Sequence, residues 1–359
     1  MKRKKKIIII TSRFPFPLDK GDKLRIYHQI RYISTHNDIY LIALNTEKNI
    51  SKEYFDELKK YCKQINIIKI NLLTRCYNLI KAFISNKPLQ VGYFYSKKAQ
   101  GEIDSIISNI QPDWCYSQLI RTAEYTKNKN NNVIDYMDAL SKGIERRVKK
   151  FPLFLQPLIK REFYITKKYE IDILNKFKKQ IIITANDRDY INHEKRELIN
   201  IISNGVDTNY FRPRPTKLKT YDIVFVGNMN YPPNIVAAVY LCEKILPIIE
   251  KKYKICKVLI GGTNPHNKVK RLANKNITIS GWVKDIRETY RAGKIFVAPM
   301  FIGTGLQNKL LEAMAMGIPS ITTTLANNAL LANKSQIIIA NNHIEFANAC
   351  VKILKNKNI

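Results

Sequence analysis

Short apolar runs alternate with longer amphipathic stretches along the whole chain. In the first half the runs cover residues 7–10, 39–44, 65–70, 114–116, 133–136, 181–184 and 199–202. In the second half they cover residues 222–226, 257–260, 277–280, 295–299, 320–323 and 336–339. Short, β-branched runs separated by helical spacing are typical of buried parallel strands. The pattern therefore predicts an α/β protein with two Rossmann-like, doubly wound parallel sheets.

A basic segment punctuated by proline, RPRPTKLKT at residues 212–220, separates the two series. Such composition is typical of a linker. We therefore expect an N-terminal domain at residues 1–204, a linker at 205–220 and a C-terminal domain at 221–359. An alternative for the last helix is that it returns to the N-terminal domain.

The stretch GTGLQNKLLEAMAMGIP, residues 303–319, follows a predicted strand and predicts a glycine loop leading into a helix. Gly303 and Gly305 let the backbone turn tightly, and free N–H groups at a helix start favour an anion. Lys309 and Glu312 are three residues apart and share one helix face, where they could contact a pyrophosphate and sugar hydroxyls. The alternative is an ordinary exposed ion pair. Gly317 is placed to end the helix.

The chain has 61 Lys and Arg against 29 Asp and Glu, a formal net charge of +32. This excess favours a polyanionic partner such as a nucleic acid, an anionic bilayer or a phosphorylated substrate, although part of it reflects a general richness in Lys, Asn and Ile. The six cysteines form no C-x-x-C pair, which argues against a zinc site and fits a reducing cytoplasm. No apolar run approaches the roughly 20 residues that span a bilayer. We expect a soluble or peripheral protein.

Two segments combine apolar and basic residues. ERRVKKFPLFLQPLIKRE, residues 145–162, has the composition of an interfacial membrane contact, and residues 77–95 form a second candidate of this type. Both could equally be ordinary helices that pack their apolar sides on the sheet. The sequence leaves these two interpretations open.

Three further candidate positions follow predicted strands. Gly21 lies in a glycine loop after the first strand, which could also be a plain connection. Asp138 follows the strand at residues 133–136 and is a candidate for contacting an acceptor hydroxyl, or else a helix cap. Asp187-Arg188-Asp189 has the spelling of a metal-binding D-x-D motif, but it begins a helix, where acidic residues suit the helix dipole, so we do not assign it a metal.

Four segments resemble the family 4 glycosyltransferases of the GT-B fold. The segment at residues 303–319 resembles the family's "G…K…LEAMA.G.P" helix, except that Thr304 stands where the family has its first glutamate. This departure resembles the branch associated with PEP-CTERM exopolysaccharide systems, as does FPFPLDKGDKLRIYHQIRYIS near the N-terminus. The other resemblances are SNGVDTNYFRP (203–213), DIVFVGNMNYPPN (222–234), and KVLIGG with ITISGWVKDIRETYRAG.

The resemblance implies two domains facing a cleft, with a nucleotide-sugar donor in the C-terminal domain and a polysaccharide or lipid-linked acceptor in the N-terminal one. It implies transfer of a sugar with retention, without a metal and with no cofactor besides the donor. For catalysis it points to Lys309 and Glu312, with Asp138 added as above. The donor residues that it implies are Gly21, Gly227, Asn228, Trp282, Val283, Gly303, Thr304, Gly305, Lys309, Leu310 and Glu312.

Two other functions stay open at this point. A GT-B enzyme could rearrange a nucleotide sugar, as an epimerase does, instead of transferring its sugar. A basic nucleic-acid-binding protein is the second alternative, but the charge is spread through the chain and no recognition motif is present. We expect a cytoplasmic protein, with a peripheral position on the inner face of the plasma membrane as an extension of that prediction.

Overall fold

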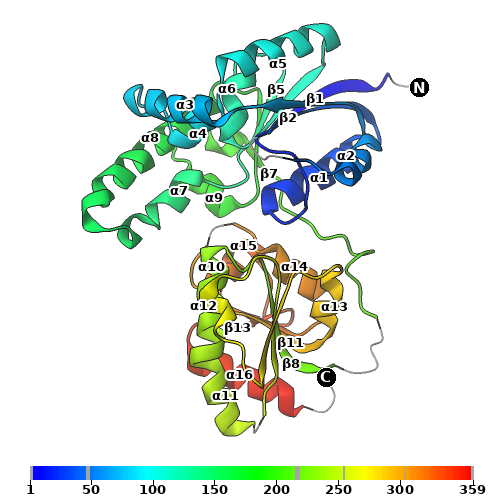
Figure 1. Cartoon of the computed structure of the whole chain (residues 1–359), viewed down its shortest axis with the longest axis vertical. Helices are drawn as coiled ribbons and strands as arrows, with labels where there is room; N and C mark the ends of the chain where they lie inside the picture. Colours follow the sequence, from blue (N-terminus) through cyan, green and yellow to red (C-terminus); the bar gives the residue numbers. More distant parts are fainter. Residues whose placement is uncertain (1–2, 46–48, 215–218, 254, 304, 357–359) are drawn as a thin grey trace. The chain divides into compact units, whose positions relative to one another are not determined.

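The computed structural model describes residues 3–45, 49–214, 219–253, 255–303 and 305–356. The chain divides into two compact units, Met1–Ser203 and Asn204–Ile359 (Figure 1). Each unit holds one parallel sheet with helices packed against it. The predicted fold class, two Rossmann-like parallel-sheet units, is confirmed.

The N-terminal unit contains a seven-stranded sheet in the order β3-β2-β1-β4-β5-β6-β7, and every pairing is parallel. Each predicted strand of the first series is present. The order reverses between β1 and β4, where α/β sheets open a crevice at the carboxyl ends of the strands. The strands are β1 (Lys5–Thr11), β2 (Asn37–Asn45), β3 (Cys62–Lys69), β4 (Trp114–Gln118), β5 (Asn132–Asp135), β6 (Lys179–Ile182) and β7 (Ile199–Ile201).

Both faces of this sheet are buried, as its β-branched strands predict. On β1, Ile9 packs with Ile26 and Ile30 of α1, whereas Ile8 and Ile10 pack in a separate cluster with α5. The helices are α1 (Gly21–Ile33), α2 (Lys52–Lys59), α3 (Leu72–Ile84), α4 (Leu89–Phe94), α5 (Lys97–Ile110), α6 (Ala123–Thr126), α7 (Leu140–Glu145), α8 (Gln156–Leu174) and α9 (Ala185–Tyr190). Short 3₁₀ turns are η1 (Ile120–Thr122), η2 (Val148–Lys150), η3 (Leu153–Leu155) and η4 (Arg196–Leu198).

The C-terminal unit contains a six-stranded parallel sheet in the order β10-β9-β8-β11-β12-β13. Its strand order reverses between β8 and β11. The strands are β8 (Tyr221–Val226), β9 (Val258–Gly261), β10 (Ile277–Gly281), β11 (Gly293–Ala298), β12 (Ser320–Thr322) and β13 (Ile338–Ile339). The helices are α10 (Pro232–Tyr240), the π-helical η5 (Leu241–Ile245), α11 (Leu246–Lys252), α12 (Asn267–Lys270), α13 (Ile286–Arg291), α14 (Asn308–Ala315), α15 (Thr324–Leu330) and α16 (His343–Lys355).

Two helices of this unit bear on expectations drawn from the sequence. The last helix, α16, packs Phe346, Ala347 and Cys350 into the core of the C-terminal unit, which holds it against its own sheet rather than the N-terminal unit. The continuous helix Pro232–Lys252 is the one described helix long and apolar enough to cross a membrane, and half of its most apolar window is buried. Its buried side faces the core, so the apolar composition serves packing of this unit.

The segment expected as a linker, 205–220, begins with ordered contacts; its residues 215–218 lie outside the described part of the chain. The Asp207 carboxylate accepts hydrogen bonds from the backbone N–H groups of Asn209 and Tyr210. Phe211 packs edge-on against Tyr290, with ring centroids 6.2 Å apart. The Asp207 bonds order the segment itself, and the Phe211–Tyr290 contact attaches it to the rest of the C-terminal unit.

Candidate functional site

The loop before α14 has the backbone that its glycines predict. Gly303 and Gly305 have φ angles of +135° and +70°, a region that side chains other than glycine rarely adopt. Thr304, the position of the missing glutamate, lies outside the described residues. The helix begins at Asn308 and ends as predicted: Gly317 has a φ of +67°, and the N–H of Ile318 donates to the carbonyl of Ala313 in a Schellman motif.

Lys309, in the first turn of α14, directs its ammonium toward the end of β8. The Nζ atom donates a hydrogen bond to Oδ1 of Asn234 and lies 5.2 Å from the ring centroid of Phe225. Gly227 follows β8 beside it: a Cβ atom added there would lie 3.3 Å from Lys309 Nζ and 2.6 Å from Asn234 Nδ2. A side chain at position 227 would therefore displace Asn234 or Lys309.

Burial lowers the pKa of Lys309 to about 7, and the nearby Glu312 carboxyl opposes this shift. The residue as a whole is half-buried, and its ammonium lies against Asn234, Phe225 and the sulfur of Met300. Across the described residues, no carboxylate oxygen lies within 4.0 Å of this Nζ. An anion entering here would stabilise the charged form.

Glu312 is held by Tyr290 instead of by Lys309. The Tyr290 hydroxyl donates to Glu312 Oε2 at 2.6 Å and lies 3.3 Å from the carbonyl oxygen of Lys309. Burial raises the pKa of Glu312, while the Tyr290 hydrogen bond and the charge of Lys309 act in the opposite direction. The exposed ion pair considered from the sequence is therefore wrong, because both side chains are half-buried and each has another partner.

The remaining predicted donor residues of this unit have distinct environments. Leu310 is fully buried and anchors α14 in the core. The Asn228 side chain accepts from the backbone N–H of Asn230, and its carbonyl accepts from Asn234, so it shapes the loop after β8. Trp282 is 70% exposed after β10 and Val283 is half-buried, so a core-packing role for Trp282 is excluded.

These residues share one edge of the C-terminal sheet. Gly227 follows the carboxyl end of β8, Trp282 follows that of β10, and the loop to α14 follows that of β11. The helices α10 and α14 carry Asn234 and Lys309 from opposite sides of the β8/β11 switch point (Figure 1). Open α/β sheets bind ligands at this position.

The N-terminal unit places its candidates at the corresponding edge of its own sheet. Gly21 begins α1, and a Cβ atom built there would meet nothing within 4 Å. Asp138 is half-buried after β5, and the N-cap of the following helix α7 is Ala139, so Asp138 is not its cap. Its neighbour Asp135 is fully buried and accepts hydrogen bonds from Arg25 Nε and the Tyr116 hydroxyl, both at 2.7 Å.

A polar cluster at this edge was missed by the sequence reasoning. Arg13 Nε lies 3.2 Å from Asp22 Oδ2, and Gln118 donates to the Asp22 carbonyl. Burial lowers the pKa of Arg121, helped by Arg13, whereas Asp22 and Asp138 oppose the shift. The buried hydroxyl of Ser12 has no hydrogen-bond partner in the described structure. Only the position of Arg13 after the first strand, in SRFPFPLDKGD, hinted at this cluster.

Two other features lie apart from the site. In the D-x-D segment, Asp187 lies in the first turn of α9, as expected for an acidic residue that suits the helix dipole, and the N-cap is Thr184. The Thr184 hydroxyl donates to the Asp187 carboxylate and accepts from the Asp187 backbone N–H. No group of three metal-ligating side chains occurs in the described ranges.

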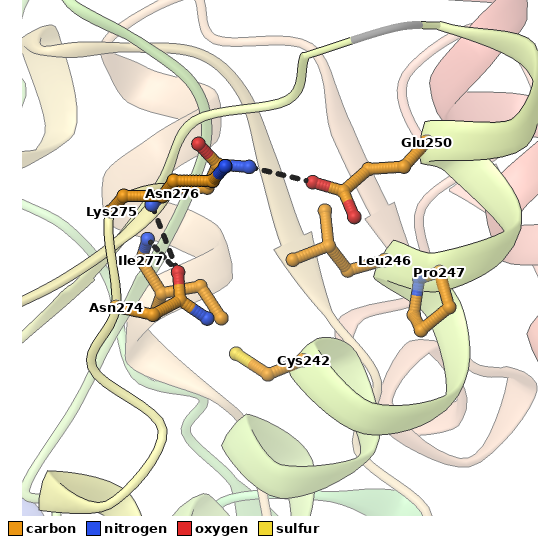
Figure 2. A pocket seen from close by; sticks show the side chains of 8 residues that line it. All are labelled: Cys242, Leu246, Pro247, Glu250, Asn274, Lys275, Asn276 and Ile277. Carbon is orange, nitrogen blue, oxygen red and sulfur yellow. Dashed lines mark hydrogen bonds between the residues drawn. The ribbon is translucent and has the colours of Figure 1, made fainter.

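Figure 2 shows a pocket of about 650 Å³ at the amino end of β10, the opposite edge of the C-terminal sheet, where Glu250 accepts from Asn276 at 3.0 Å. Asn274 also accepts from the backbone N–H groups of Asn276 and Ile277, and the pocket contains none of the candidate site residues.

Comparison with known proteins bears on this geometry. Residues 220–356 match the family model described as glycosyl transferases group 1. The matched segment makes up most of the C-terminal unit. It contains Gly227, Asn234, Tyr290, Lys309 and Glu312, all the residues gathered at the β8/β11 edge.

Two relatives extend the comparison. An uncharacterized 44.6 kDa protein of the cps region of Klebsiella pneumoniae is 25% identical over 373 residues, covering 98% of this chain and 91% of that protein. The UDP-Gal:alpha-D-GlcNAc-diphosphoundecaprenol alpha-1,3-galactosyltransferase of Escherichia coli is 29% identical over 181 residues, which cover 44% of this chain and 46% of the relative.

Solved structures resemble the whole chain. Anabaena HepE in complex with UDP-glucose has a TM-score of 0.64 at 13% identity, covering 99% of this chain and 91% of that one. TarM of S. aureus has a TM-score of 0.67 at 13% identity, covering 99% and 92%. Together with the two parallel sheets, these likenesses show the GT-B fold for this chain.

Proposed function

We propose that this protein is a glycosyltransferase that moves a sugar from a UDP-sugar to a saccharide acceptor carried on a lipid diphosphate. The observation that carries the proposal is the half-buried Lys309, whose ammonium faces Gly227 at the switch point without a carboxylate partner among the described residues. The named activity of the E. coli relative and the UDP-glucose complex of HepE support this choice of donor and acceptor.

The chemistry requires that the bond between the sugar C1 and the diphosphate oxygen breaks while an acceptor hydroxyl bonds to C1 and loses its proton. The bonding electrons go to the diphosphate, so negative charge grows there. Lys309 and the backbone N–H groups of the loop at Gly303 and Gly305 would stabilise that charge. Because Gly227 lacks a side chain, a phosphate could approach Lys309 closely.

Glu312 would orient the donor by accepting hydrogen bonds from sugar hydroxyls. Tyr290 would act as a positioning residue, because its hydroxyl holds one carboxylate oxygen of Glu312 at 2.6 Å. The exposed Trp282 and the half-buried Val283 would contact the nucleotide base from the loop that follows β10. We extend the proposal to retention of the anomeric configuration and to a reaction that needs no metal.

On the acceptor side, the proposal uses the carboxyl edge of the N-terminal sheet. Asp138 would contact the acceptor hydroxyl, and Arg13 and Arg121 offer cationic groups for phosphate on the acceptor. The proposed setting is cell-surface glycan synthesis on the cytoplasmic side of the membrane, of the kind found in PEP-CTERM exopolysaccharide systems. The cps-region relative supports this setting.

Two assays test the proposal. Thermal stabilisation by a panel of UDP-sugars identifies the donor, because a ligand that binds the folded state raises its melting temperature. The chosen donor is then incubated with and without a polyprenyl-diphosphate-linked saccharide. Transfer predicts UDP release and a longer saccharide only when acceptor is present. Conversion of the donor alone to an isomeric nucleotide sugar would establish the rearranging enzyme instead.

A further inference from the structure

The N-terminal unit exposes a set of large apolar side chains on α3 and on the turn that leads into α8. In η3, Leu153 and Phe154 are 83% and 79% exposed, and η3 contains no buried residue. In α3, Leu73 is 82% exposed. We call this surface the α3–η3 face, and it consists of Leu73, Tyr77, Ile80, Phe83, Leu153, Phe154 and Leu158, all exposed.

The two parts of this face are continuous. Arg161 of α8 lies over the Phe83 ring at 4.1 Å and donates to the Phe83 carbonyl at 2.6 Å. Leu158 precedes Arg161 by three residues in α8 and so lies on the same face of that helix, and Phe154 lies in η3, which leads directly into α8. From Phe83, Ile80 continues the row along α3 at helical spacing. Figure 1 shows α3 and α8 on the same side of the N-terminal unit.

The residues around this face carry a large excess of positive charge. Residues 72–87 contain three Lys and Arg and no acid, and residues 145–168 contain eight Lys and Arg and two Glu. Of the two glutamates, Glu162 is buried and accepts from the N–H of Leu89, whereas Glu145 is exposed and accepts from the Tyr190 hydroxyl, so only Glu145 adds negative charge to this surface. Lys81, Arg146 and Lys160 are exposed. The face therefore offers apolar side chains within a cationic surround.

We propose that the α3–η3 face docks the protein onto an anionic membrane surface, with Leu153 and Phe154 inserted among the lipids. Basic residues near such a surface are attracted to its anionic headgroups, and exposed Phe and Leu side chains gain by leaving water. The charge selects this occupant, because the surround is cationic and a bilayer rich in anionic lipid is complementary to it. This inference goes beyond the proposed reaction, since binding requires neither donor nor acceptor.

Vesicle co-sedimentation of the full chain tests it, using phosphatidylcholine vesicles with and without phosphatidylglycerol. The wild type should bind the anionic vesicles at low salt, bind neutral ones far more weakly, and dissociate as salt rises, because the Debye length falls from about 10 Å at 0.1 M to about 3 Å at 1 M. The double variant Leu153→Ser, Phe154→Ser should bind anionic vesicles about tenfold or more weakly.

Two further variants sharpen the result. Leu73→Ser with Ile80→Ser removes apolar side chains from the α3 part of the face and should also weaken binding. Leu331→Ser, at a position in the C-terminal unit that is 82% exposed, is the matched control and should bind like the wild type. Melting temperatures should stay unchanged throughout, because the replaced side chains are exposed. No binding by the wild type at low salt, equal binding to neutral vesicles, or full binding by both double variants would overturn the proposal.

Discussion

Lys309 has an environment that suits an intermittent anionic ligand. A cation paired permanently with a carboxylate would keep a high pKa, whereas burial against Phe225 and Asn234 brings this one to about 7. The free protein therefore holds an ammonium that is poorly solvated. The diphosphate of a bound donor would supply the negative charge that Lys309 lacks as a partner. The packing around Lys309 therefore fits the proposed reaction.

Replacing Lys309 by Ala should weaken binding of the UDP-sugar and depress transfer. Loss of one charge-assisted contact is worth roughly 1.5–3 kcal/mol, so the dissociation constant should rise about ten- to a hundredfold. Calorimetry with UDP measures it, and Lys251→Ala, an exposed lysine on α11, is the control. Unchanged affinity in the Lys309 variant would remove this residue from the donor site.

Donor affinity should also depend on pH. Below about pH 7 Lys309 is charged in the free protein, and above it the ammonium loses its proton, so binding must then take a proton up. The diphosphate of a nucleotide sugar has no group that titrates near neutral pH. Its affinity should therefore fall as pH rises from about 7 to about 9, by up to roughly tenfold per unit.

Calorimetry in buffers of different ionisation enthalpy would detect this proton uptake directly. The Lys309→Ala protein should show neither the pH dependence nor the uptake, since the titrating group is gone. A wild type whose affinity stays flat across this range would mean that Lys309 keeps its charge without the ligand.

At the residue level, sequence reasoning found the pair Lys309 and Glu312 because helical spacing places positions three apart on one face. It could not find Tyr290, whose hydroxyl reaches Glu312 from α13, since that contact depends on how two helices pack. The segment containing Tyr290 was recognised as similar to the family, but its spacing gives no sign of a partner 22 positions away. Arg121 was missed for the same reason.

At the level of elements, the strands were predictable and the helices less so. A parallel strand buried on both faces needs a continuous apolar run, so β1 and β8 are visible in the sequence without any tertiary information. The face that a helix buries is decided by its neighbours. The apolar residues of α3 fit a core helix as well as a surface helix, and only their exposure in the structure separates the two.

The loop between β8 and α10 gives a prediction of its own. In Gly227→Ala, the new Cβ atom would lie 2.6 Å from Asn234 Nδ2 and 3.3 Å from Lys309 Nζ, so one of these side chains must move. Donor affinity should fall about ten- to a hundredfold, as expected for a misplaced binding group. Overpacking should lower stability by roughly 1–3 kcal/mol.

Gly101→Ala is the matched control for this change. A Cβ atom at Gly101, inside α5, meets nothing within 4 Å, and alanine favours a helix, so stability should rise by about 0.5–1 kcal/mol with donor binding unchanged. Donor titration and thermal melting of both variants would decide the matter. Normal binding by Gly227→Ala would show that Lys309 tolerates displacement and that the Gly227 contact is dispensable.

At the level of the whole molecule, the +32 charge and the two sheets have separate consequences. Each sheet places its ligand candidates at the carboxyl edge of its own switch point, which follows from the parallel strand order alone. The net positive charge does not determine the fold, but it favours binding to anionic partners, from small molecules to membranes. A diphosphate donor, an acceptor carrying phosphate and an anionic bilayer all belong to that class.

We predict that sugar transfer by this protein continues when divalent metal ions are removed by a chelator. A divalent cation is one way to stabilise the negative charge of a leaving diphosphate. In this protein Lys309 and the backbone N–H groups of the loop before α14 are placed to stabilise that charge instead. Transfer measured as UDP release should therefore be unchanged by EDTA, with the Lys309→Ala protein as the comparison in which charge stabilisation is reduced. If EDTA silenced the wild type and manganese restored it, the diphosphate would depend on a metal, and Lys309 would have at most a supporting part in the chemistry.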